Sequence, residues 1–172
     1  MSAPQPEPWL RGPVAGIPAL LQPAAHAFIM SIEDCESAVA GLPDQLVWIE
    51  HAGAASIGFH LRHLAGATDR LLTYARGDTL TSAQKAALVG ERSPGDPAPS
   101  AETLLTAWHE GVDRALAQLA ATPEAKLLEF RGVGRGQLPS SVLGLLFHAA
   151  EHASRHTGQV VTTAKVARAR LR

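Results

Sequence analysis

Three histidines, His148, His152 and His156, follow one another at intervals of four residues near the C-terminal end of the chain. Residues four apart on an α-helix project from the same face, with Cβ atoms about 5–6 Å apart, so two such imidazoles can bind one metal ion from a single helix. Neutral imidazole is the commonest protein ligand for divalent transition metals. The spacing therefore predicts a metal site on the last helix.

His152 and His156 are the better placed pair in this column. At about 100° per residue they fall near the centre of the apolar stripe of the helix, whereas His148 lies toward its edge. A buried imidazole without a partner costs roughly 1–3 kcal/mol, and a shared ion would satisfy both rings. The alternative is that each ring bonds a neighbouring carbonyl, hydroxyl or carboxylate. The stripe consists of Leu145, Ala149, Val160 and Thr163.

A third ligand has to come from a facing helix, and the string HLRHLAG supplies His60 and His63. Helical periodicity mildly favours His60, which lies closer to the apolar stripe of its helix, and it leaves both candidates open. Gln159, three residues beyond His156, is expected either to orient a ligand ring or substrate or to cap a polar edge. His60 and His148 are candidates to relay protons or to line the mouth of the site.

Apolar residues at three- and four-residue spacing predict four long helices, at about 18–40, 57–76, 101–121 and 141–168. Ser56, Ser100 and Ser140 or Ser141 are expected N-caps, and Thr81 or Ser82 starts a short extra helix. Pro23 either kinks the first helix or marks its true start. The glycine-rich stretch 127–139 is expected to be irregular, with room for a short extended piece. The elements predict an all-α, four-helix bundle.

The 172 residues are enough for one domain with a hydrophobic core. The proline-rich residues 1–16 are expected to form an extended N-terminal arm, anchored by Trp9 and Leu10, and residues 17–172 to form the bundle. The sole cysteine, Cys35, cannot form an intramolecular disulfide and is expected in the core.

Fifteen basic residues against 16 acidic ones provide no field that would attract nucleic acid. No apolar run is long enough for a transmembrane helix, and no secretory signal is visible, so we expect a cytoplasmic protein without a membrane partner. Glu151 and Arg155 are expected to form an exposed pair. The C-terminal basic run is expected to be a solvated helix end. It consists of Lys165, Arg168, Arg170 and Arg172.

Two short strings carry a resemblance to a known family. LRHLAG, Leu61 to Gly66, and HASRHTGQ, His152 to Gln159, resemble the motifs of the DinB-like superfamily of bacterial metal-binding bundles, and the similarity spans roughly residues 17–168. The resemblance implies a bundle of crossed connectivity that is often a homodimer. It also implies that His63, rather than His60, joins His152 and His156 around a divalent metal, typically zinc or nickel.

Three imidazoles leave a coordination position open, which is the catalytic rather than the structural arrangement for zinc, and such an ion activates water or a thiol. The resemblance implies a thiol-dependent transferase or isomerase using a low-molecular-weight thiol cosubstrate, or a hydrolase, acting on a small-molecule substrate. Two alternatives remain. One is a non-catalytic metal-binding or stress-related interaction protein. The other is a dimeric bundle whose core histidines are satisfied without metal.

Overall fold

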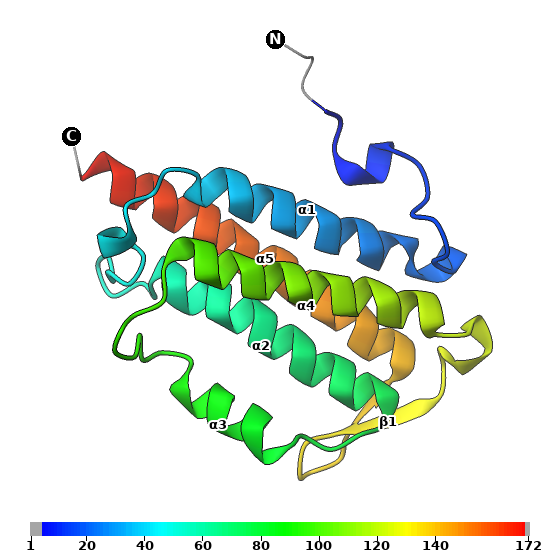
Figure 1. Ribbon diagram of the computed structural model, residues 1–172. Coiled ribbons are helices and arrows are strands. Elements are labelled where there is room, and N and C mark those ends of the chain that lie inside the picture. Colours follow the sequence, from blue (N-terminus) through cyan, green and yellow to red (C-terminus); the bar gives the residue numbers. More distant parts are fainter. Residues whose placement is uncertain (1–4, 171–172) are drawn as a thin grey trace.

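Four long helices lie lengthwise beside one another in the computed structural model, which describes residues 5–170 (Figure 1). They are α1 (Gln22–Val39), α2 (Ile57–Arg76), α4 (Ala101–Ala121) and α5 (Val142–Ala169). Helix α5 packs against α1 and α2, and α4 packs against the same two helices. The short helix α3 (Ser82–Gly90) lies outside this group, against α2. Among the described residues no helix is both long and apolar enough to cross a membrane.

The predicted helix starts are confirmed by their capping bonds. The side chains of Ser56, Ser100 and Ser141 each accept a hydrogen bond from the backbone N–H three residues later. These bonds satisfy amide groups that have no partner inside the helix. Thr81 caps α3 in the same way, in a capping box with Gln84. The caps therefore fix where α2, α3, α4 and α5 begin.

Pro23 marks the start of α1 and does not kink it. It stands in the first helical turn, where its missing N–H costs no hydrogen bond. Residues Ala19–Leu21 before it form a 3₁₀ turn. Helix α2 ends as expected at Gly77, whose φ of 89° is readily adopted only by a residue without Cβ.

The glycine-rich segment forms a β-hairpin, so the chain is mostly helical rather than all-α. Strand β1 (Phe130–Val133) pairs with β2 (Leu138–Ser141) antiparallel, with Phe130 opposite Ser141 and Val133 opposite Leu138. Gly134 turns the chain with a φ of 67°. The strands are too short for periodicity to identify them. The hairpin leads directly into the N-cap of α5.

Small side chains on α5 let its neighbours approach closely. Ala149, Ala150 and Ala153 are almost fully buried between the histidine positions of that helix. Between α1 and α5 the Ser31 and Thr157 hydroxyls are 2.5 Å apart. Cys35 beside them is completely buried, and burial raises the pKa of its thiol to about 12. Cys35 is therefore a core residue, as expected, and not a nucleophile at neutral pH.

The N-terminal arm lies against α1, but not through the side chains that were expected to hold it. Trp9 and Leu10 are 59% and 57% exposed, so the prediction that they anchor the arm is wrong. The Arg11 guanidinium instead pairs with the Glu33 carboxylate on α1, with distances of 2.5 and 2.7 Å. Residues 1–4 of the predicted arm lie outside the described part of the chain.

The C-terminal basic run is only partly a solvated helix end. The Arg168 guanidinium donates to the Ala38 and Ala40 carbonyls, at 2.6 and 2.8 Å. It thus satisfies carbonyl groups at the C-terminal end of α1 that have no helical partner. Lys165 is exposed, as expected, and Arg172 lies outside the described residues.

Two glycine substitutions test this packing in opposite directions. A Cβ on Gly58 would lie 2.5 Å from Cε2 of Trp48, whose indole N–H is held by the Pro99 carbonyl. We expect Gly58→Ala to lower the free energy of unfolding by about 1–3 kcal/mol through overpacking. The matched control is Gly158→Ala, where a Cβ meets nothing within 4 Å. It should raise stability by roughly 0.5–1 kcal/mol through helix propensity. Urea denaturation measures both, and equal effects would contradict the packing argument.

Candidate metal centre

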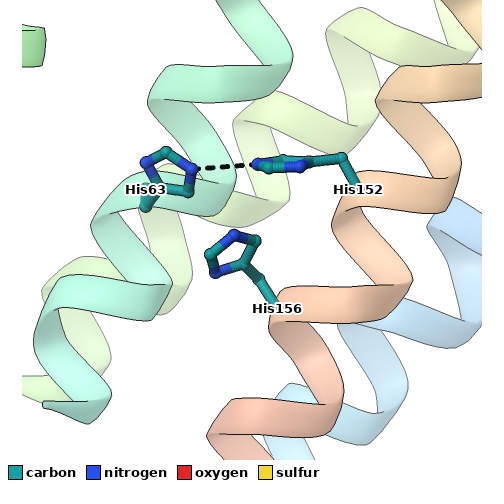
Figure 2. Close-up of side chains that lie close together, drawn as sticks. All are labelled: His63, His152 and His156. Atoms are coloured by element: carbon teal, nitrogen blue, oxygen red, sulfur yellow. Dashed lines mark hydrogen bonds between the residues drawn. The ribbon is translucent and has the colours of Figure 1, made fainter. Parts of the chain in front are cut away.

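His63, His152 and His156 converge in the space between α2 and α5 (Figure 2). One nitrogen from each ring can be chosen so that all three atoms lie within 4.8 Å of one another. Nε2 of His63 is 2.9 Å from Nε2 of His152, and the ring centroid of His156 is 4.5 Å from those of both other histidines. The two helices thus bring together the three side chains that the sequence motifs select.

His60 lies directly beside this trio and more deeply buried than His63. It is 6% exposed, and its Nδ1 is 2.9 Å from Nδ1 of His156. The helical periodicity was therefore correct that His60 faces the interior. The α2 histidine that the family motif selects, His63, is the one gathered with the α5 pair, and its role as a ligand stays a prediction. His60 thus contacts the trio through His156, and His63 is part of the trio.

The other two candidates lie farther out. His148 is exposed and its Nδ1 is 3.1 Å from the Glu151 carboxylate, while its ring centroid is 5.5 Å from that of His152. Gln159 is exposed and takes no part in the hydrogen bonds of the cluster. The predicted Glu151–Arg155 pair is present at the surface, at 2.5 Å. His148 is thus placed at the rim of the cluster, and Gln159 remains a prediction.

Glu91, just beyond the C-terminal end of α3, is a site residue that the sequence did not indicate. Its Oε2 accepts a hydrogen bond from Nδ1 of His63 at 2.6 Å, and its Oε1 accepts one from the Arg70 guanidinium at 2.6 Å. Glu91 and Arg70 are only 4% and 8% exposed. Because Nδ1 of His63 donates to the carboxylate, its Nε2 keeps a lone pair that faces His152.

Gly66 makes room for this carboxylate. A Cβ at Gly66 would lie 2.6 Å from Oε1 of Glu91 and 2.9 Å from Nη1 of Arg70. A glycine inside a helix costs about 1 kcal/mol relative to alanine, so its presence in the string LRHLAG indicates a close approach. That glycine is the one sequence signal that could have pointed to a group packed over α2 at this position.

Three imidazoles here, those of His60, His152 and His156, are uncharged at neutral pH. Burial, together with the neighbouring ring of His63, lowers the pKa of His60, His152 and His156 to about 4 in each case. Burial favours the protonated form of Glu91, but its hydrogen bonds outweigh that effect and hold the pKa of the carboxyl below its usual value. The site therefore combines the neutral rings of His152 and His156 with one buried carboxylate anion, that of Glu91, behind His63.

An aromatic ring and the segment after α3 cover the cluster. The Phe59 ring stacks on His63 at a centroid distance of 5.3 Å and meets His60 edge-on at 5.2 Å. Arg62, between the two α2 histidines, donates to the Gly90, Ser93 and Pro94 carbonyls. These bonds hold the backbone around residues 90–94 against α2 and so keep Glu91 over His63.

The residues present fit a divalent metal ion. Nδ1 of His152 is buried and has no hydrogen-bond partner among the described residues. Nitrogen ligands bind zinc at about 2.0–2.1 Å, so atoms gathered this closely need only small rotations to meet at one ion. The carboxylate behind His63 is the partner that metal-binding histidines usually have. A separate cavity of about 460 Å³ is lined by the hairpin and by residues at and after the C-terminal end of α2. None of these histidines lines it, so we assign the candidate chemistry to the cluster.

Comparison with known proteins gives a family and a fold. A family model described as the DinB superfamily matches residues 27–160. A crystal structure of a protein from Streptococcus pneumoniae is similar over 83% of this chain and 86% of that chain, with a TM-score of 0.58 and 12% sequence identity. At that identity the likeness concerns the fold alone. No curated protein matches the chain.

The buried Arg70–Glu91 pair leads to a stability prediction. Glu91→Gln removes the anion and leaves the guanidinium of Arg70 buried without a counter-charge, so we expect the free energy of unfolding to fall by about 3 kcal/mol. Glu36→Gln is the control, because Glu36 pairs with the exposed His109 at the surface. That change should cost less than about 0.5 kcal/mol. Denaturant titration of both variants checks the difference, and a near-neutral Glu91→Gln would refute it.

Proposed function

Because this chain belongs to the DinB superfamily, we propose that it is an enzyme that binds one divalent metal ion through His63, His152 and His156 and acts on a small molecule. The observation that carries the proposal is the convergence of three imidazoles from two helices on a common point. The proposal includes a bundle of the DinB type over residues 17–172 behind an N-terminal arm over residues 1–16.

The bound ion would supply Lewis acidity, which lowers the pKa of a water molecule or thiol at an open coordination position. Within the protein, Glu91 holds His63 in the tautomer whose Nε2 can bind metal. Phe59 and the segment after α3 keep solvent from one side of the cluster. Zinc and nickel are the ions we favour, since imidazole donors suit both.

The reaction type rests on the open position that three histidines leave. We favour a transferase or isomerase that uses a low-molecular-weight thiol, or a hydrolase, in a cytoplasmic homodimer. His148 at the rim is exposed and able to exchange protons with solvent. Two further side chains are candidates to hold a proton or to orient the bound molecule. One is His60, which is hydrogen-bonded to His156, and the other is Gln159, about one helical turn after His156.

A second candidate is a non-catalytic metal-binding or stress-related interaction protein. Exposed apolar side chains around the hairpin favour it, because such side chains often mark a contact surface. Phe130, Leu138 and Phe147 are 64%, 65% and 59% exposed. The two candidates share the metal site and differ in turnover.

Metal binding is tested on tag-free protein by calorimetric titration with zinc and with nickel. Wild type should bind one ion per chain, and His152→Ala should bind at least about 100-fold more weakly, since it removes a ligand rather than a supporting group. His109→Ala, an exposed histidine on α4, is the control and should leave the affinity unchanged. Wild-type protein that takes up no stoichiometric ion would contradict the proposal.

Turnover separates the enzyme from the interaction protein. Metal-loaded protein is screened with low-molecular-weight thiols against electrophilic substrates, and with ester and amide substrates for hydrolysis. Any activity found should disappear in His152→Ala and persist in His109→Ala, because only the former removes a proposed ligand. Activity that survives in His152→Ala would refute the metal mechanism. Absence of turnover in loaded wild type across the screen would favour the non-catalytic candidate.

A further inference from the structure

The carboxylates beside the candidate metal centre are already engaged. Glu91 pairs with Arg70 behind the cluster, and Glu151 pairs with Arg155 at its rim. Each of these ion pairs is close to neutral as a whole. Any net charge beside the centre therefore comes from charged side chains that are not part of an ion pair.

Arg92 is such a group. Its guanidinium lies over the Phe59 ring, 5.0 Å from the centroid, and among the described residues no carboxylate pairs with it. Phe59 in turn stacks on His63, so the guanidinium is within about 10 Å of that imidazole, which is about one Debye length at 0.1 M ionic strength. Arg92 is exposed and can reach a bound molecule without losing a contact to another charged group.

The backbone on both sides of Arg92 is held against α2. Arg62 binds carbonyls on both flanks of it, those of Gly90 and Pro94. The Arg92 guanidinium lies over the Phe59 ring, an arrangement that leaves N–H groups free to bind another molecule. Those N–H groups match the two oxygens of a carboxylate better than any neutral group.

From this geometry we propose that Arg92 binds a carboxylate of the molecule that occupies the metal centre, so that the substrate class is a small organic acid. The inference rests on the proposed metal site. A divalent ion on the three histidines would add positive charge near the guanidinium, and the nearby carboxylates of Glu91 and Glu151 are already paired with arginines. An anionic group on the incoming molecule would therefore interact favourably with both the ion and Arg92.

The test compares two thiols of the same length, 3-mercaptopropionate and 3-mercapto-1-propanol, on full-length protein loaded with cobalt. Both deliver a thiol to the ion, and binding is followed by the thiolate-to-cobalt absorption band. Wild type should prefer the acid, and Arg92→Gln should reduce this preference about fivefold, the effect expected of one partly solvated charge-assisted hydrogen bond. Arg92→Glu should reverse it. Arg114→Gln is the matched control, since it removes the same charge from α4, where Arg114 pairs with Glu110.

The outcomes are distinguishable. A preference for the acid that persists in Arg92→Gln, or that falls equally in Arg114→Gln, overturns the role of Arg92 and leaves the metal site intact. Failure of the wild-type chain to bind cobalt refutes the proposed metal function itself. A loss of preference confined to the Arg92 variants, with an unchanged cobalt spectrum before thiol is added, supports the carboxylate subsite.

Discussion

The candidate site depends on the close packing of α2 against α5. Imidazoles are short side chains, and three of them can meet only if the two helices that carry them approach closely. Alanines interleaved with the histidines of α5 permit that approach. The same contact that buries the hydrophobic core therefore also gathers the nitrogen donors. Burial also keeps the rings of His152 and His156 uncharged, which is the state in which nitrogen can bind a metal ion.

The electrostatics around the cluster follow from the same burial. A buried carboxylate needs compensation, and Glu91 has two donors, from His63 and Arg70. The absence of a side chain at Gly66 is what lets the carboxylate lie so near the helix. Together these contacts fix the orientation of the His63 ring. The arrangement lowers the reorganisation needed on binding, since His63 is already oriented.

Local signals predicted most of the fold and the histidines of the site. Capping serines and apolar periodicity gave the helix starts, because both act within a few residues along the chain. The four-residue spacing placed His152 and His156 on one face, but the choice of His63 over His60 needed the family motif. Glu91 was missed because its contact with His63 depends on how α3 docks, and no local pattern encodes that docking. The hairpin was missed because two four-residue strands carry too little periodicity.

Helix α3 lies outside the four long helices, yet the segment at its end supplies the carboxylate behind His63. Occupancy of the centre and attachment of that segment are therefore linked in free energy, and the linkage is reciprocal. If attachment of the segment raises the affinity for the ion by some factor, a bound ion raises the equilibrium constant for attachment by the same factor. Helix α3, which contributes no buried side chain of its own, would in this way be coupled to binding of the proposed ion.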